Sequence, residues 1–155
     1  MFSNRKITDD FKTPLEAWIK LSPYIPRNKK IWSPFYCDGS QKQFFNILGF
    51  DIIHEDEDFF ENDKGEIVVC NPPFSKKREV LERLVKLNKP FMVLLPSSVI
   101  NNKWFHKLVN YDFQIIFFKK EIHYKNLNEK VKYTFNWGTY CVCWKIGLDK
   151  DINFI

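Results

Sequence analysis

A long hydrophobic run is absent from this sequence of 155 residues, and a membrane-spanning helix needs about 20 apolar residues in succession. The first ten residues, MFSNRKITDD, also lack the apolar core of a secretory signal peptide. Internal repeats, low-complexity tracts and obvious linkers are missing as well. We therefore expect no membrane partner, and a single domain over residues 1–155, because a chain of this length can bury a core of its own.

Cysteine pairs with metal-ligand spacing are missing too. The chain has four cysteines, mostly within apolar, strand-like stretches, without a C-x-x-C pair or a histidine partner at ligand spacing. The pattern predicts reduced, structural thiols in a cytoplasmic setting and no metal site that uses cysteine. These residues are Cys37, Cys70, Cys141 and Cys143.

The composition is that of a globular domain with spare aromatic rings. Hydrophobic residues make up 45% of the chain and charged residues 28%, which is ordinary for a globular protein. The aromatic share is 17%, with sixteen phenylalanines, so rings are available for stacking. The net charge, 24 − 19 = +5, is compatible with a nucleic-acid partner without requiring one.

The most informative stretch runs from Glu66 to Phe74 and reads EIVVCNPPF. Its apolar run, Ile67 to Cys70, predicts a strand buried on both faces. The strand must end at the tetrapeptide Asn71-Pro72-Pro73-Phe74, because consecutive prolines cannot donate ladder hydrogen bonds. Ser75 is then expected to cap a helix over residues 76–87. In open α/β sheets, ligands bind at the edge where such strands end.

The tetrapeptide also has a chemical interpretation. The side-chain oxygen of Asn71 and the carbonyl of Pro72 are two acceptors on a stiff backbone, able to take both hydrogens of an aromatic amine. Phe74 offers a ring for stacking, so a planar base with an exocyclic amine would satisfy all three groups. The alternative is a proline-rich turn between a strand and a helix, and the strand–helix context favours the functional interpretation.

Hydrophobic periodicity predicts strands that alternate with helices along the chain. This alternation is typical of βαβ units around a largely parallel sheet, so the fold class is α/β. The last two strands have no convincing helix between them and are expected to pair as an antiparallel hairpin at one edge. The expected strands are 31–35, 50–54, 67–70, 91–95, 113–118 and 140–146, and the expected helices are 14–21, 41–48, 76–87 and 101–109.

Four segments together resemble the S-adenosylmethionine-dependent adenine methylases. The tetrapeptide matches that family's catalytic motif outright, whereas the other three segments are similar to its elements around the cofactor. The resemblance implies a Rossmann-like class I methyltransferase fold, S-adenosylmethionine as cofactor, and methyl transfer to the amine of adenine in nucleic acid. The other segments are Phe11-Lys12-Thr13-Pro14, the loop Ser33-Pro34-Phe35-Tyr36-Cys37-Asp38-Gly39, and Asp58-Phe59-Phe60.

The resemblance assigns roles to individual residues of this chain. Glu55 and Asp56 are the candidates for the ribose hydroxyls, with Asp56 preferred, since doubly wound folds place an acidic residue at the end of the second strand. Asp58 would accept from the amino group of the cofactor's adenine, and Phe59 would lie against its ring. A solvated acidic loop and a carboxylate metal site are the alternatives for this segment. The implied catalytic residues are Asn71, Pro72, Pro73 and Phe74, and the implied cofactor-binding residues are Thr13, Pro14, Phe35, Asp38, Gly39, Asp56, Asp58 and Phe59.

The chain departs from the family pattern at several places. Ser33 stands where the family usually has an acidic residue, and Cys37 stands in place of a glycine. Loss of the acid would weaken cofactor binding or move its task to Asp38. The helix usually found before the Asp-Phe element is missing, and 155 residues leave no room for a separate target-recognition domain. Such compactness would suit a bacterial, phage-borne or virus-borne enzyme.

Two basic stretches are candidates for contact with a nucleic-acid backbone. Lys76, Lys77 and Arg78 begin a helix, where cations oppose the helix dipole unless a phosphate lies nearby. The loop 119–132, with Lys125, interleaves lysine and tyrosine, and Trp137 follows it before the last strand. A solvated surface is the alternative for the basic stretches, and core packing is the alternative for Trp137.

Several functions remain open at this point. DNA is the preferred substrate, while similar tetrapeptides occur in enzymes that methylate RNA adenines or glutamine of protein release factors. The latter usually carry a fuller glycine-rich loop and an extra N-terminal helical domain. The alternative from another class is a catalytically silent, methyltransferase-like subunit that binds nucleic acid, which Ser33 and Cys37 favour and the intact tetrapeptide opposes. A partner subunit or a homodimer is compatible with either.

Overall fold

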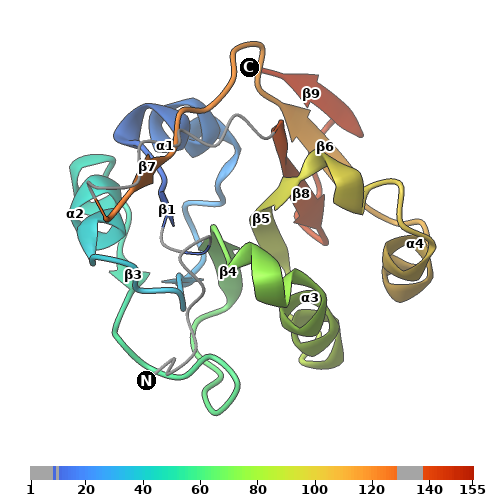
Figure 1. The fold of residues 1–155 in the computed structure, drawn as a ribbon, viewed down its shortest axis with the longest axis horizontal. Coiled ribbons are helices and arrows are strands. Elements are labelled where there is room, and N and C mark those ends of the chain that lie inside the picture. The colour runs from blue at the N-terminus through green and yellow to red at the C-terminus, as the bar shows by residue number, and fades with distance from the viewer. Residues whose placement is uncertain (1–8, 10, 129–137) are drawn as a thin grey trace.

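The computed structural model describes residues 9, 11–128 and 138–155, which form an α/β fold around one seven-stranded sheet (Figure 1). The sheet order is β3-β2-β4-β5-β8-β6-β9, as expected for a Rossmann-like architecture with a mostly parallel sheet. The strands are β2 (Ile31–Trp32), β3 (Ile52–Ile53), β4 (Ile67–Cys70), β5 (Phe91–Pro96), β6 (Gln114–Phe117), β8 (Thr139–Trp144) and β9 (Ile152–Phe154).

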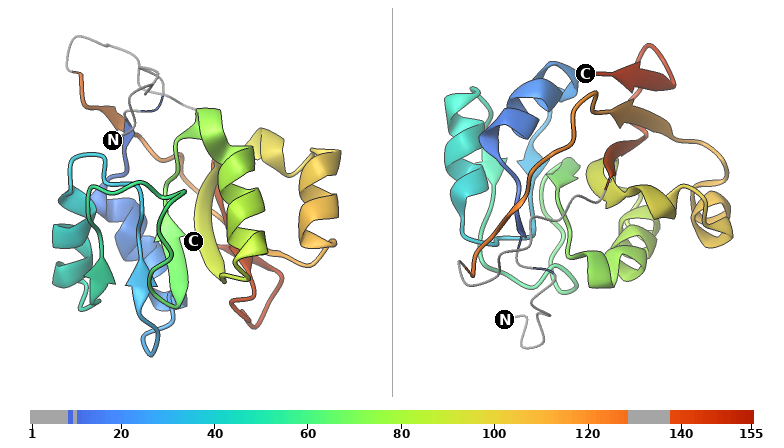
Figure 2. Two further views of the ribbon diagram at one scale, coloured as in Figure 1. Left: turned by 90° about the horizontal axis from the view of Figure 1, so that it is seen from below. Right: turned by 45° about the horizontal axis from the view of Figure 1, so that its top comes forward.

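Helices cover both faces of this sheet. Helices α1 and α2 pack on one face, and α3 and α4 pack side by side on the other (Figures 1 and 2). The four helices were predicted from their periodicity, and their bounds shift by two residues at most. They are α1 (Leu15–Leu21), α2 (Ser40–Ile47), α3 (Lys77–Lys86) and α4 (Lys103–Val109), with short 3-10 turns η2 (Ser22–Tyr24), η3 (Phe74–Lys76) and η4 (Ser97–Val99).

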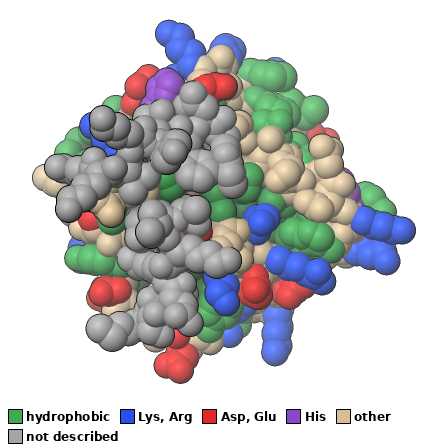
Figure 3. Space-filling view, in the orientation of Figure 1, with side chains coloured by type: hydrophobic (Ala, Val, Ile, Leu, Met, Phe, Trp, Pro, Cys, Tyr) green, Lys and Arg blue, Asp and Glu red, His purple; other side chains and the backbone are tan. Residues whose placement is uncertain are grey.

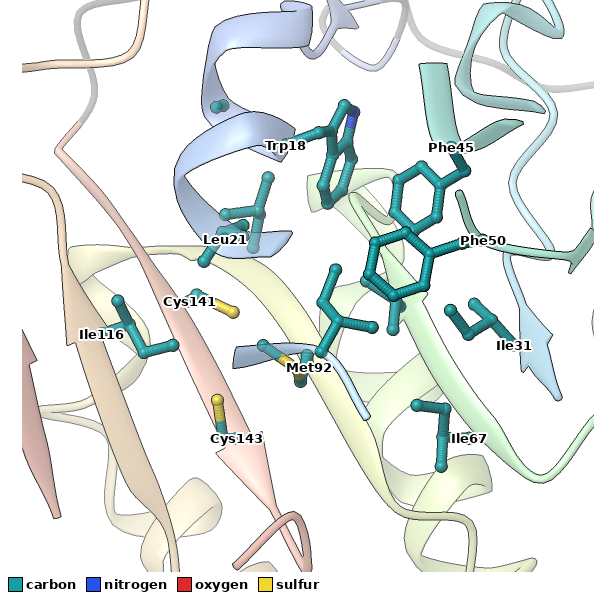
Figure 4. Close-up of a cluster of buried hydrophobic side chains, with 14 of the residues drawn as sticks. Trp18, Leu21, Ile31, Phe45, Phe50, Ile67, Met92, Ile116, Cys141 and Cys143 are labelled. Atoms are coloured by element: carbon teal, nitrogen blue, oxygen red, sulfur yellow. The ribbon is translucent and has the colours of Figure 1, made fainter. Parts of the chain in front are cut away.

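Strand alternation divides the core into two clusters. In β4, Ile67 and Val69 face α1 and α2, whereas Val68 and Cys70 face α3 and α4, and all four side chains are buried. Figure 4 shows the first cluster, where Trp18 of α1 packs edge-on against Phe45 of α2 with ring centroids 5.2 Å apart. Strand β4 is therefore buried on both faces, as its continuous apolar run predicts.

The two strands near the chain's carboxyl end pair as predicted, but one of them lies inside the sheet. Strand β8 runs antiparallel to both β5 and β6, between which it is inserted. The outer position belongs to β9, which pairs in parallel with β6 and had not been predicted. A second, two-stranded sheet joins β1 (Phe11–Lys12) to β7 (Lys125–Asn126) in antiparallel register.

Strand order reverses between β2 and β4. From β2 the chain crosses through α2 to β3 on one side, and then returns past β2 to form β4 on the other side. Ligands in open α/β sheets bind in the crevice outside the carboxyl ends of the strands at such a switch point. The carboxyl ends of β2 and β4 lead into the loop Ser33–Gly39 and into the tetrapeptide, respectively.

In the described part of the chain, no helix combines the length and apolar character that crossing a bilayer requires. All four cysteines are free thiols, as expected, and three of them are buried. Burial raises the pKa of the Cys70 thiol far above its ordinary value, which keeps this side chain protonated. A reducing, cytoplasmic compartment stays a prediction from cysteine usage, as does the single-domain assignment.

The packing of α3 gives a first testable prediction. Leu84 is fully buried between α3 and the sheet, so Leu84→Ala should lower the free energy of unfolding by about 2–5 kcal/mol. Ile47 of α2 is 65% exposed, and Ile47→Ala should change it by less than about 0.5 kcal/mol. Urea denaturation followed by circular dichroism measures both, and equal losses would contradict the assigned packing of α3.

Candidate active site

The switch point holds a pocket that collects residues from three separate segments. Its cavity volume is about 20 Å³, and the surrounding empty space of about 290 Å³ includes open solvent. The lining includes four residues singled out from the sequence, namely Thr13, Phe35 and Asp38 among the predicted cofactor residues and Asn71 among the predicted catalytic ones. The remaining lining residues are Phe11, Lys12, Trp18, Tyr36, Cys37, Ser40 and Gln41.

Asn71 presents an unsatisfied acceptor at this pocket. Its Oδ1 atom is buried and has no hydrogen-bond partner among the described residues. Strand β4 ends at Cys70, and Pro72 and Pro73 then hold the backbone extended, with φ −61° and ψ 121° at Pro73. A buried acceptor without a partner costs about 1–3 kcal/mol, so such an atom is typical of a site that a ligand donor completes.

Phe74 begins a short 3-10 turn rather than the helix itself. The carbonyl of Phe74 accepts a hydrogen bond from Lys77 Nζ at 3.2 Å. Ser75 does not cap α3, contrary to the expectation from its position: its hydroxyl and its backbone amide both bind the carboxylate of Asp9. Helix α3 starts at Lys77, one residue later than expected, with Lys76 at its cap position. The proline pair and η3 therefore displace the helix start.

The loop after β2 needs a left-handed backbone at Gly39. The φ angle of Gly39 is 77°, and a Cβ atom there would lie 2.5 Å from the Tyr36 hydroxyl, so only glycine fits. Its amide donates to the Tyr36 carbonyl at 2.7 Å and closes the turn. Cys37, which replaces a glycine of the family pattern, also has a positive φ of 53°. Cys37 therefore adopts the left-handed backbone conformation that glycine favours.

Asp38 is held by partners on both of its oxygens. The Ser40 amide donates to Oδ1 at 3.0 Å, and Lys12 Nζ lies 3.0 Å from Oδ2. Partial burial alone would raise the pKa of Asp38, but the hydrogen bonds from Ser40 and the charge of Lys12 outweigh it and lower the pKa. Asp38 therefore stays a carboxylate, the form that a cationic ligand group requires.

Thr13 and Pro14, which are adjacent in sequence, line two different sites. Thr13 is buried, and its Oγ1 has no hydrogen-bond partner among the described residues, so it is a second unsatisfied group at the pocket. Pro14 precedes α1 and instead lines a separate groove with Lys20, Lys120 and Lys125. The structure thus brings Thr13, and not Pro14, to Asn71.

The acidic segment after β3 lies outside the pocket lining. Glu55 and Glu57 both bind Lys64, at 2.9 and 2.6 Å, and Asp56 is exposed. Asp58 uses Oδ1 to accept the Phe60 amide at 2.8 Å, which makes it a turn-stabilising residue here. In the described ranges, no cluster of His, Cys, Asp and Glu has the arrangement of a metal site.

Phe59 is a core residue in this structure. Its side chain is fully buried and packs against Trp32 and Phe35, with ring centroids 5.5 and 5.1 Å away. Arg83 lies over the same ring and donates to the Phe59 carbonyl at 3.0 Å. Phe59 therefore supports Phe35 from behind, and Phe35 is the member of this pair that lines the pocket.

Sequence reasoning missed Gln41, which bridges the two strand ends. Ser33 is completely buried and donates from Oγ to Gln41 Oε1 at 2.9 Å, while Gln41 Nε2 donates to the Val69 carbonyl at 3.1 Å. A carbonyl can only accept, so the orientation of the Gln41 amide is fixed. The pair Ser33–Gln41 thus replaces an acidic side chain at the strand end with a neutral link to β4. No local sequence signal marks Gln41, because its partners are 8 and 28 residues away.

His54 forms the far wall of the same region. Its Nδ1 lies 2.7 Å from the Ser33 carbonyl, so Nδ1 carries the proton in the neutral ring, and Tyr36 stacks on the imidazole at 5.2 Å. Burial lowers the pKa of His54 below its ordinary value, although the hydrogen bond to Ser33 opposes the shift. This histidine is therefore neutral in the folded protein near pH 7.

The predicted nucleic-acid residues fall into three places. Lys76, Lys77 and Arg78 follow the tetrapeptide after Ser75, and Figure 3 shows Lys and Arg side chains across the flank formed by α3 and α4. Lys125 is exposed in β7, beside the groove next to α1. Trp137 lies outside the described residues.

Comparison with known proteins matches the part of the chain that holds the tetrapeptide. A family model described as adenine-specific methyltransferase EcoRI matches residues 52–144, which is 144 − 52 + 1 = 93 of the 155 residues and includes the tetrapeptide. The type II methyltransferase M.EcoRI of Escherichia coli is 30% identical over 81 residues, or 48% of this chain and 25% of the relative. The chain thus spans about a quarter of that relative's length, and the loop Ser33–Gly39 precedes the family match.

The Gln41 bridge gives a prediction about stability. Gln41→Leu should lower the free energy of unfolding by about 2 kcal/mol or more, because it leaves the Ser33 hydroxyl and the Val69 carbonyl unpaired. Gln43 is exposed on the same helix, so Gln43→Leu is the matched control and should cost little. Urea denaturation compares the two variants, and equal stability would show that the bridge contributes nothing.

His54 predicts how stability depends on pH. Because its pKa is lowered from 6.5 in the folded state, the unfolded chain binds a proton that the folded chain refuses as the pH falls below about 6.5. The contribution of neutral His54 to stability is thus complete above that pH. It is lost as the pH falls towards the pKa of His54 in the folded state. The free energy of unfolding should be lower at about pH 5.5 than at about pH 7.5, and His54→Asn should reduce the difference.

The exposed His123 supplies the control for that measurement. His123→Asn should leave the pH dependence of unfolding as it is in the wild-type protein. A pH dependence that disappears in His123→Asn and persists in His54→Asn would contradict the role of burial.

Proposed function

The chain belongs to the EcoRI family of adenine-specific methyltransferases, and from that membership we propose that it transfers a methyl group from S-adenosylmethionine to the exocyclic amine of adenine in DNA. The observation that carries the proposal is the buried, unpartnered Oδ1 of Asn71 at the switch-point pocket. An amine donor is what this acceptor lacks, and the tetrapeptide lies within the residues that the family model matches.

The catalytic residues act through acceptors rather than through a general base. Asn71 Oδ1 and the Pro72 carbonyl accept the two amine hydrogens of a flipped-out base, which draws the nitrogen towards tetrahedral geometry and frees its lone pair. Pro73 fixes the backbone between Pro72 and Phe74, and Phe74 stacks on the base. The contribution of these residues is positioning and electrostatic stabilisation, and the proton of the methylated nitrogen leaves to solvent.

The residues around the pocket fit S-adenosylmethionine, which when bound supplies an electrophilic methyl group. Thr13 Oγ1 and Asn71 Oδ1, both buried and without a partner among the described residues, face a pocket that also holds the carboxylate of Asp38. We assign Asp38 to the cationic amino group, Gly39 to the close approach of backbone, and Phe35 to apolar contact. Pro14, Asp56, Asp58 and Phe59 stay predictions, and Phe59 would act through Phe35.

Nucleic acid would approach along the carboxyl edge of the sheet. Lys76, Lys77 and Arg78 come one residue after the tetrapeptide, so a phosphate beside the target base would lie within their reach. Lys125 in β7 is a more distant contact, and Trp137 is proposed from its place in the sequence. RNA offers the same phosphates and the same adenine amine, which makes it the alternative substrate.

A catalytically silent, nucleic-acid-binding subunit is the second candidate, and one observation favours it. Ser33 and Gln41 satisfy one another, so Asp38 is the single carboxylate that lines the pocket among the described residues. A homodimer or a partner subunit would be compatible with this role as well. Cofactor binding separates the two candidates.

The decisive experiment titrates S-adenosylmethionine into the purified protein by calorimetry and then measures tritiated methyl transfer to unmethylated DNA and to RNA. We expect binding, and label on DNA. Binding without transfer to either polymer would favour the silent subunit, and label on RNA alone would reassign the substrate.

Asn71→Ala tests the catalytic assignment. Methyl transfer should fall by a factor of about 100 or more, because a positioned transition-state acceptor is lost, while cofactor affinity stays within a few fold. Asn46→Ala is the control for a generic asparagine loss, since Asn46 is exposed near the end of α2 and does not line the pocket. Near-normal transfer by Asn71→Ala would remove this residue from the catalytic site.

A further inference from the structure

The starts of α3 and α4 form a surface on which two residues of α4, Lys103 and Trp104, have no role in the proposed function. We define the α3–α4 surface by Lys76, Arg78, Lys103 and Trp104. Helix α3 follows the tetrapeptide at the end of β4, and α4 follows Pro96 at the end of the neighbouring β5. Both helix starts therefore lie at the carboxyl edge of the sheet, on the same side as Asn71.

A cation–π contact joins the two helices at this surface. The guanidinium carbon of Arg78 lies 5.5 Å from the centre of the Trp104 ring, and Arg78 Nε donates to Glu82 at 2.8 Å. Trp104 packs partly into the core below, against Phe105. Arg78 is thus held between a ring and a carboxylate while its side chain stays 59% exposed, and its Nη groups have no partner in the described part of the chain.

Cations gather at this surface, although Asp9 binds Ser75 beside it and Glu82 pairs with Arg78. Lys76 and Arg78 flank the first residue of α3, where the helix dipole disfavours cations, and the exposed Lys103 lies beside Trp104 on the neighbouring helix. Glu79 is also exposed in this turn, one residue past Arg78 and so about 100° further round the helix. Figure 3 shows the Lys and Arg side chains of this flank spreading outwards over α3 and α4. A polyanion would offset the repulsion among these cations.

We propose that the α3–α4 surface binds the sugar-phosphate backbone of DNA beside the target base, with Lys103 and Trp104 as new members of that interface. Arg78 contacts a phosphate through its Nη groups, and Trp104 is a positioning residue that orients the guanidinium. Lys103 contacts a second phosphate, which extends the path from β4 to β5. The inference rests on the proposed function for its substrate. It assigns the path of the DNA backbone over the protein surface and not the methyl-transfer reaction.

Binding of a fluorescein-labelled DNA duplex, followed by anisotropy over a series of salt concentrations, tests the surface. Arg78→Gln and Lys103→Gln should each weaken binding severalfold and lower the slope of log affinity against log salt by about 0.9, the value for one lost phosphate contact. Lys86→Gln removes the same charge from the exposed far end of α3, and it should leave the slope unchanged.

Trp104→Leu tests the positioning role. It keeps an apolar side chain against the core while removing the ring below Arg78. We expect a loss of affinity similar to that of Arg78→Gln, and no further loss when the two changes are combined. Thermal unfolding checks that the variant folds; if it does not, the exposed Arg78 and Lys103 variants decide the question.

The outcomes separate this inference from the proposed reaction. If Arg78→Gln and Lys103→Gln bind DNA as Lys86→Gln does, the surface assignment is wrong even where methyl transfer is intact. If the wild-type protein transfers no methyl group but these variants lose DNA affinity, the surface assignment holds and the proposed catalysis fails. S-adenosylmethionine affinity should be unchanged in every variant, and a shared loss would indicate distortion of the pocket instead.

Discussion

Burial of β4 on both faces is the constraint on which the rest of this structure depends. Ile67 to Cys70 are buried between two helical layers, so every backbone group of the strand must be paired within the sheet. Pro72 and Pro73 cannot meet that requirement, and the strand therefore stops at Asn71. The stop delivers a rigid polar segment to the carboxyl edge, at the place where strand order reverses.

That reversal explains why the site lies between β2 and β4 rather than elsewhere along the edge. Beyond Trp32 and Val68 the two strands no longer pair, and the Gln41 amide spans the gap by linking Ser33 to the Val69 carbonyl. The space outside this link is the pocket, and Thr13 and Asn71 face it with unsatisfied oxygens. Of the four buried side-chain atoms without a partner among the described residues, these two therefore lie at the pocket, while Nε2 of His54 and Nδ1 of His106 lie outside its lining.

Local patterns predicted the four helices and six of the strands, but not β1, β7 or β9, because apolar periodicity records which face of each element is buried. The strand end at the tetrapeptide and the turn at Gly39 could also be predicted. Proline ends a strand, and glycine is favoured where φ is positive. The contacts that could not be predicted join distant segments: Asp9 with Ser75, β1 with β7, and Ser33 with Gln41. Phe59 shows the same limit. The local sequence does not distinguish a phenylalanine that contacts a ligand from one that packs behind the contacting residue.

The neutral pair Ser33–Gln41 follows from its own burial. Ser33 is completely buried, and an unpaired carboxylate in its place would carry a desolvation penalty of several kcal/mol. A hydroxyl paired with an amide avoids that penalty and still ties β2 to β4. The single charge of the loop then lies at Asp38, which is partly exposed and supported by Lys12. Moving the carboxylate outwards by five residues thus keeps an anionic group at the pocket while the strand end stays neutral.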